Sequence, residues 1–480
     1  MSLPAIMVML ATLAADVASV ATVSPVNLDT SQTSSILGVA KTLAEGAMSY
    51  YPGSAAAFGD LPAPYYWWEN GALMGAMLDY SHYTNDSTYD DVLTTAISSQ
   101  VLAPSYDLMV PAHQGDEGND DQAFWAFTVL SAAERNFPQT SDTSIPSWLQ
   151  VAENAFNTMS ARWNTSACGG GLLWQIFASN PNGLNYRNSV SNGGLFQMSA
   201  RLYRATGNQT YLDWANKVWE WSTAVGFVDE NYNVFDGADS RDNCTIDKRN
   251  NLTFSYGVGI YMYGAAVLAN ATNDTDASTW TTHTEGLLQA ATVFFNYNDN
   301  STGVMYERAC EPYGTCSTDM ESFKGYLSRF MYASAIMVPS IATQVASYME
   351  ASAGAAGQAC SGGSNSTTCG QKWYTNAFDG SVGLGQEMSA LETVQGLLAK
   401  DAPAPYGKDE IKDVRQSTSS TTGTTAETTT TTTTSPSTVV SATATSAPAK
   451  AKRARSLGVR QVPGWGMVVG VVAWVGWVAA

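Results

Sequence analysis

Histidine and simple metal-binding motifs are nearly absent from this chain of 480 residues. The only histidines are His82, His113 and His283, and no C-x-x-C pair occurs. This argues against a zinc site. A G-x-S-x-G elbow is also missing, so a serine hydrolase is not supported. We therefore expect neither a metal nor a cofactor.

Basic residues are few, with 23 Lys and Arg against 42 Asp and Glu, a formal net charge of −19. Leaving out Asp16 of the leader and the five basic residues of 450–461 (both described below) changes this charge to −23. Such a surface argues against binding nucleic acid or anionic lipid. It suits a neutral or basic partner, such as a neutral polysaccharide. Alternatively, the acidity only keeps a secreted protein in solution.

Cysteine usage and glycosylation motifs both indicate an oxidising, secretory compartment. The six cysteines include two closely spaced pairs, Cys310 with Cys316 and Cys360 with Cys369, which would leave Cys168 to pair with Cys244. The sequence leaves other connectivities open. The chain has nine N-x-[ST] sequons, which together predict a glycoprotein: Asn85, Asn164, Asn208, Asn243, Asn251, Asn270, Asn273, Asn300 and Asn365.

The composition of the two ends of the chain predicts targeting segments. Residues 1–21 are apolar and end in Ser19-Val20-Ala21, which predicts a signal peptide; a buried N-terminal helix is the alternative. Residues 406–449 are rich in Thr and Ser, as in an O-glycosylated stalk. A basic spacer and an apolar tail fill 450–480 and predict a GPI-attachment signal, with a transmembrane helix as the alternative. We expect a secreted protein that is held at the cell surface.

The middle, residues 25–405, shows helical spacing with no dividing linker. Residues 147–163 carry one apolar stripe, whereas 123–133 are apolar on nearly every side, so an amphipathic helix should cover an enclosed one. Six αα-hairpins can close into a ring or stay open as a solenoid, and the glycine- and aromatic-rich loops favour a ring with a loop-lined central cleft. The fold class is all-α, with helices expected over 32–50, 67–83, 89–102, 120–136, 147–163, 190–206, 211–225, 254–271, 276–295, 320–335, 339–353 and 384–400.

Two adjacent carboxylates, Asp120 and Asp121, stand at the predicted start of the enclosed helix, behind Asn119 as N-cap and with Gln122 reaching back to it. At a helix terminus both can face one pocket, and the helix dipole favours their ionised forms. Two close carboxylates push their pKa values apart, as a general acid and a nucleophile require.

Consecutive residues that share a pocket fit the 5–5.5 Å carboxyl separation of retaining glycosidases better than the wider separation of inverting ones. Alternatively, these acidic residues of the first helical turn only complement the helix dipole and take no part in catalysis. Calcium on Asp116, Glu117, Asp120 and Asp121 is another, although EF-hand spacing is missing.

Aromatic residues gather at a second helix start. The segment "PYYWWENG" (64–71) places Tyr65, Tyr66, Trp67 and Trp68 side by side. Flat rings of this kind stack on sugar faces, and core packing is the competing interpretation of each one.

Four segments carry a family resemblance: "GNDDQAFWA" (118–126), "GGGLLWQI" (169–176), "YRNSVSNGGLFQMSARLYRATGN" (186–208) and "FKGYLSRF" (323–330). They resemble glycoside hydrolase family 76, and in particular its fungal, GPI-anchored mannan endo-1,6-α-mannosidases of the cell wall. The resemblance implies an (α/α)6 barrel and retaining cleavage or transfer of α-1,6-mannosidic bonds.

Residue by residue, the resemblance implies that Asp120 is the nucleophile and Asp121 the acid/base. It places Asn188, Ser189 and Asn192 in the cleft, in contact with mannose hydroxyls. The weaker correspondences are Trp68, Trp125, Trp174, Tyr256 and Lys324. One departure is Gly257, where relatives usually carry Asn, which affects fine subsite specificity rather than the chemistry.

The resulting hypothesis is a monomeric endo-α-1,6-mannosidase of cell-wall mannan. A transglycosylase that joins the GPI-core mannose glycan of wall proteins to wall polysaccharide is a close variant, since a covalent intermediate can be resolved by water or by a sugar hydroxyl. A non-catalytic, mannan-binding wall protein is the alternative of a different class.

Overall fold

The computed structural model describes residues 26–53, 60–115, 117–180, 183–299 and 302–415. The predicted signal peptide, the predicted GPI signal, the stalk beyond residue 415, Asp116 and Asn300 lie outside these ranges.

All twelve predicted helices are present, in two concentric layers of six. The inner layer consists of α2 (Trp67–Thr84), α4 (Asn119–Glu134), α6 (Ser189–Thr206), α8 (Ser255–Ala271), α10 (Phe323–Met337) and α12 (Leu384–Gln395). The outer layer consists of α1 (Thr33–Met48), α3 (Asp90–Ser99), α5 (Trp148–Ala161), α7 (Gln209–Ala224), α9 (Asp274–Ala291) and α11 (Ala342–Ala359).

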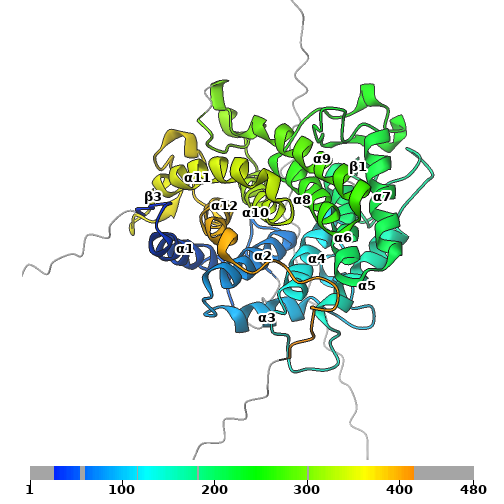
Figure 1. Cartoon of the computed structure of the whole chain (residues 1–480), viewed down its shortest axis with the longest axis horizontal. Coiled ribbons are helices and arrows are strands. Elements are labelled where there is room, and N and C mark those ends of the chain that lie inside the picture. The colour runs from blue at the N-terminus through cyan, green and yellow to red at the C-terminus, as the bar shows by residue number, and fades with distance from the viewer. Residues whose placement is uncertain (1–25, 54–59, 116, 181–182, 300–301, 416–480) are drawn as a thin grey trace, which may run out of the picture. The chain divides into compact units, whose positions relative to one another are not determined.

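The inner helices form a closed ring. Each packs against the next even-numbered helix, and α12 returns to contact α2 (Figure 1). The outer helices lie around this ring, as α7 does against α6 and α9 against α8. The fold is therefore an (α/α)6 barrel, and the open solenoid is excluded because a solenoid would leave α2 and α12 apart.

Helix position follows the distribution of apolar residues. In α4 nearly every side chain is buried, whereas α5 buries one stripe, Trp148 to Met159, against the inner layer. Close approach of the inner helices depends on small residues. Gly71 of α2 faces the ring of Trp125, and a Cβ at Gly71 would lie 2.8 Å from that ring.

The inner helices run parallel to one another, since N-terminal ends contact N-terminal ends and C-terminal parts contact C-terminal parts. At their N-terminal ends, the rings of Trp68, Phe124 and Tyr326 lie within 5.8 Å of one another, from α2, α4 and α10. Further toward their C-terminal ends, buried ion pairs link Arg329 to Asp79 and to Glu392, and Arg201 to Glu134. Six positive helix ends therefore point at one face of the barrel, where they favour carboxylates.

The opposite face is crossed by residues 402–415, here termed the C-terminal strap (orange in Figure 1). Arg204 donates to the carbonyls of Pro405 and Tyr406, and the backbone of Gln139 donates to Val414 O at 2.7 Å. Residues 406–415 thus pack on the barrel, although the predicted boundary at 405 assigned them to the stalk. The prediction missed this packing because these residues are held by hydrogen bonds to backbone groups, which leave no hydrophobic pattern in the sequence.

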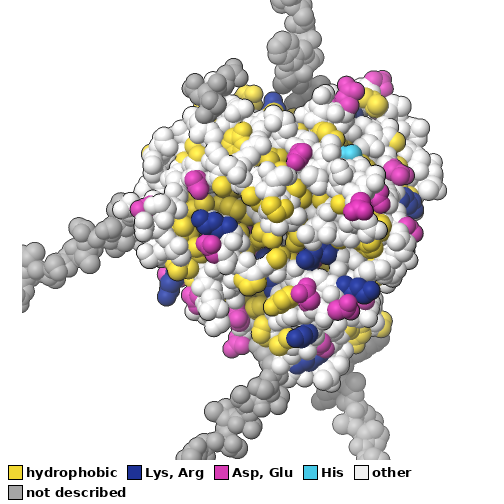
Figure 2. Space-filling view, in the orientation of Figure 1, with side chains coloured by type: hydrophobic (Ala, Val, Ile, Leu, Met, Phe, Trp, Pro, Cys, Tyr) yellow, Lys and Arg dark blue, Asp and Glu magenta, His cyan; other side chains and the backbone are white. Residues whose placement is uncertain are grey.

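The strap face also carries an apolar hollow of ≈ 340 Å³ over α10, α11 and the segment after α12 (Figure 2). Among the described residues that line this hollow, Glu350 is the single carboxylate, so they provide no pair of acids. Within the described residues no single helix is apolar and long enough to cross a membrane; the bent pair Phe323–Met337 and Pro339–Ala359 passes by length and composition only.

Candidate active site

The cleft at the N-terminal ends of the inner helices is built around the start of α4. This helix begins at Asn119, one residue earlier than predicted, and Gly118 precedes it. Asp121 then lies at the third helical position, where its Oδ2 accepts a hydrogen bond of 2.6 Å from the backbone N–H of Gly118. The predicted cap, Asn119, instead donates its backbone N–H to Trp174 O at 2.9 Å.

Asp120 is held from a second helix. Its Oδ2 accepts a hydrogen bond of 2.7 Å from Nδ2 of Asn188. Asn188 caps α6, where its Oδ1 accepts from the backbone N–H of Ser191 at 3.1 Å. The same amide therefore fixes both a helix start and a carboxylate of the site.

The two carboxylates lie close together. A Cβ placed on Gly118 would lie 2.5 Å from Oδ1 of Asp120 and 3.2 Å from Oδ2 of Asp121. These oxygens are therefore at most about 6 Å apart, the sum of the two distances, which fits a retaining glycosidase better than an inverting one. Only glycine leaves room here for both acids.

A cavity of ≈ 330 Å³ opens beside Asp121. Its wall contains both aromatic rings and polar side chains, as expected of a sugar site. The residues that line it are Tyr66, Trp67, Trp68, Glu117, Asp121, Trp174, Gln175, Asn180 and Asp319.

The electrostatics separate the two acids. Burial raises the pKa of Asp120 to about 7, against the opposing effect of the hydrogen bond from Asn188. Burial and the charge of Asp120 raise the pKa of Asp121 well above its ordinary value, against the hydrogen bond from Gly118. An ionised Asp120 therefore helps Asp121 to keep a proton, which is the relationship that a nucleophile and a general acid need.

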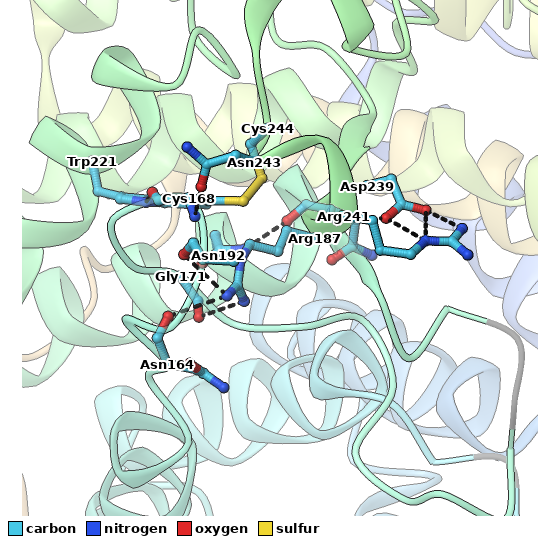
Figure 3. The surroundings of a disulfide bond; sticks show 12 residues. Asn164, Cys168, Gly171, Arg187, Asn192, Trp221, Asp239, Arg241, Asn243 and Cys244 are labelled. Carbon is cyan, nitrogen blue, oxygen red and sulfur yellow. Dashed lines mark hydrogen bonds and ion pairs between the residues drawn. A yellow bond between two sulfur atoms is a disulfide. The ribbon is translucent and has the colours of Figure 1, made fainter.

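The disulfide Cys168–Cys244 holds the start of the loop that continues to Trp174 (Figure 3 shows the disulfide). Arg187 donates to the carbonyls of Gly171 and Asn164 at 3.0 and 3.2 Å. Arg187 belongs to β1 (Tyr186–Asn188), which pairs antiparallel with β2 (Gly237–Asp239). The strand and the loop therefore position Asn188 and Trp174 as one unit.

The other predicted disulfides are also present, Cys310–Cys316 and Cys360–Cys369, the latter across the antiparallel pair β3 (Cys360–Gly362) and β4 (Thr368–Cys369). Among the described residues, no group of three or more His, Cys, Asp or Glu side chains is arranged to hold a metal ion. Eight of the nine predicted sequons are described, and the asparagine of each is exposed.

Comparison with known proteins identifies the family. The sequence profile of glycosyl hydrolase family 76 matches residues 35–409. The chain belongs to glycosyl hydrolase family 76. "Mannan endo-1,6-alpha-mannosidase DCW1" of Saccharomyces cerevisiae is 42% identical over 386 residues, which cover 79% of this chain and 83% of the relative.

Two solved structures share the family 76 fold. Dfg5 from Chaetomium thermophilum, in complex with glucosamine, superposes with a TM-score of 0.74 at 36% identity and covers 79% of this chain and 94% of its own. An inactive variant of a Salegentibacter α-1,6-mannanase, in complex with α-1,6-mannotriose, gives a TM-score of 0.60 at 19% identity, covers 76% and 99%, and shows the fold alone.

Four of the predicted contact residues of this family 76 chain lie at the cleft. Trp68 and Trp174 line the cavity, and Asn188 bonds Asp120. Tyr256 is half-buried and stacks on Phe323 at 3.8 Å, and its pKa is raised well above the ordinary value by burial, then by the charges of Asp236, Asp120 and Asp319. The effect of the last two charges indicates that Tyr256 lies near the carboxylates of Asp120 and Asp319.

The other four predicted contact residues are placed differently, because their polar groups already have partners inside the protein. Asn192 is fully buried and bonds both the N–H and the carbonyl of Leu172, and Ser189 donates to Phe235 O. These two residues hold loops rather than face the cavity.

Trp125 is likewise fully buried, and its Nε1 donates to Trp67 O at 3.2 Å. Lys324 is fully buried in an ion pair of 2.8 Å with Glu311, 3.8 Å from the ring of Trp373. The contacts of both residues are those of the protein core, and neither residue lines the cavity in the part of the chain that the structure describes.

The sequence analysis missed Asp319, Gln175 and Asn180. Asp319 accepts a hydrogen bond of 3.1 Å from Nε1 of Trp68 across the cavity. Its place, four residues ahead of the "FKGYLSRF" motif and before an inner helix, was the available signal. Gln175 and Asn180 lie in an irregular loop, for which periodicity gives no orientation.

Proposed function

We propose that this protein is a retaining, endo-acting α-1,6-mannosidase of fungal cell-wall mannan. The observation that carries the proposal is the pair Asp120 and Asp121, with oxygens at most about 6 Å apart beside a cavity walled by Trp68 and Trp174. The name of the Saccharomyces cerevisiae relative supports the substrate.

In the first step, Asp120 attacks the anomeric carbon of a mannose unit while Asp121 gives its proton to the departing glycosidic oxygen. A covalent mannosyl ester on Asp120 results, and the shortened chain leaves with the proton. In the second step Asp121, now ionised, takes a proton from water, and the hydroxide oxygen replaces Asp120 at the anomeric carbon.

Transfer to a sugar hydroxyl in place of water is the second candidate, with a wall polysaccharide as acceptor and a GPI-core glycan as donor. The structure of the Chaetomium thermophilum relative in complex with glucosamine shows that this relative binds an amino sugar, which supports a glycan containing an amino sugar as a substrate. Linear α-1,6-mannan distinguishes the two outcomes, because hydrolysis gives only shorter chains and transfer also gives longer ones.

The deciding experiment compares the wild type with Asp120→Asn on defined α-1,6-mannan. We expect turnover to fall by at least about 10³-fold, with mannan binding retained. Asp213→Asn, an exposed aspartate of α7, is the matched control and should leave turnover unchanged. Unchanged activity in Asp120→Asn would remove the proposed nucleophile, and binding without turnover in the wild type would favour a non-catalytic wall protein.

We also propose that the protein is secreted and attached to the cell surface through a GPI anchor. Three disulfides and eight exposed sequons support the secretory route. Phosphatidylinositol-specific phospholipase C should release the protein from membranes. Retention after complete digestion would instead support a transmembrane tail.

A further inference from the structure

The two catalytic carboxylates face different surroundings. Asp121 lines the ≈ 330 Å³ cavity. Asp120 does not belong to the described residues that line it. Asp120 is turned toward α6 and β1, since its Oδ2 accepts from Asn188. The cavity therefore lies on the Asp121 side of the pair.

The roles of the two acids indicate which part of the substrate binds on the Asp121 side. A nucleophile stands beneath the anomeric carbon, whereas an acid/base stands next to the oxygen of the leaving group and, later, next to the incoming water or sugar. If Asp121 is the acid/base, as in the proposed function on which this inference rests, the cavity beside it receives the leaving chain and then the acceptor.

Gln175 is placed to bind that sugar. Its backbone forms an antiparallel β-bridge with Gly118, directly ahead of the catalytic pair. The residue is 4% exposed and lines the cavity, and its side-chain Oε1 is buried without a hydrogen-bond partner.

A buried amide oxygen without a partner costs free energy, which a hydrogen bond from a sugar hydroxyl would recover once the amide turns toward the cavity. An amide accepts and donates, so it matches a pair of sugar hydroxyls. Trp174, the preceding residue, and Asn180 line the same cavity. A ring and two amides thus stand together, as sugar recognition requires.

We propose that Gln175 binds a hydroxyl of the acceptor sugar and thereby sets the balance between transfer and hydrolysis. The residue is a specificity determinant and takes no part in bond breaking. A sugar acceptor that loses this contact competes less well with water for the mannosyl ester on Asp120.

The test is Gln175→Leu, which keeps the apolar bulk and removes the amide. With α-1,6-mannotetraose as donor and α-1,6-mannobiose as added acceptor, we expect the ratio of transfer to hydrolysis products to fall about tenfold, the effect of one hydrogen bond. If the wild type only hydrolyses, the same loss is measured as about tenfold weaker inhibition by mannobiose. The rate with an aryl mannobioside, whose leaving group is not a sugar, should change less than about twofold.

Two further variants keep the result interpretable. Asn180→Ala changes a half-buried residue of the same wall and should lower the ratio in the same direction, even if Gln175→Leu folds poorly. Gln358→Ala, on exposed α11 surface, is the control. If the wild type cleaves α-1,6-mannan and both cavity variants keep its ratio of transfer to hydrolysis products, the inference is overturned. If the wild type cleaves no α-1,6-mannan, the proposed function itself is contradicted.

Discussion

Nδ2 of Asn188 lies 2.7 Å from Oδ2 of Asp120 and donates a hydrogen bond to it, which joins the start of α6 to the carboxylate pair at the start of α4. This hydrogen bond links the N-terminal ends of two neighbouring inner helices. Because the contact favours the ionised form of Asp120, it assists the role of nucleophile.

Asn188→Ala should move the acid limb of the pH–activity profile upward. Burial raises the pKa of Asp120 to about 7 while Asn188 opposes this rise, so removal of the donor raises the pKa further. The ionised nucleophile is then lost at a higher pH, by about one pH unit for a hydrogen bond to a charge. A pH profile of kcat/KM on mannan measures the shift, and an unmoved acid limb would contradict it.

Asp121→Asn should lower turnover on mannan by about 10²–10⁴-fold, because a sugar leaving group requires protonation. An aryl mannobioside has a leaving group that departs without a proton, so its first step should be far less affected. Burst kinetics with the aryl substrate separate the two steps. Equal losses with both substrates would argue that Asp121 is not the acid.

Asp319→Asn should move the alkaline limb to lower pH. The pKa of Asp121 is raised by burial first, then by Asp120, and also by the charge of Asp319. Removing the last charge lowers that pKa, so the general acid loses its proton at a lower pH. The same pH profile tests this, and an upward movement would show that Asp319 acts in another way.

Gly118→Ala should lower kcat by about 10²-fold with little loss of stability, since the added Cβ would lie 2.5 Å from Oδ1 of Asp120 and displace it. The backbone at Gly118 has φ −105°, which alanine adopts without strain. Gly115→Ala in the same loop meets nothing within 4 Å and is the matched control. Comparable rates in the two variants would mean that the pair tolerates displacement.

Arg329→Met should destabilise the barrel by about 3–5 kcal/mol, because it leaves Asp79 and Glu392 buried without this partner at the strap face. Chemical denaturation measures the loss. Arg241→Met removes an exposed pair with Asp239 and should change stability little. A small effect at Arg329 would mean that the buried acids take up protons without penalty.

Much of the fold was predictable from local patterns. Periodicity gave all twelve helices, and the contrast between 123–133 and 147–163 gave the two layers, because burial on all sides and burial on one side require different compositions. The paired aspartates were predictable as well, since a helix start concentrates polar residues that point into the barrel.

Tertiary structure alone decided which side chains meet. Asp319, nearly two hundred residues from Asp121, reaches the same cavity, while Lys324 and Asn192, inside recognisable motifs, turn into the protein to satisfy buried charges and backbone groups. Sequence determines how each helix distributes its apolar and polar residues. Closure of six helices into a ring determines which side chains of different helices face one another, because these neighbours come from segments far apart in the chain.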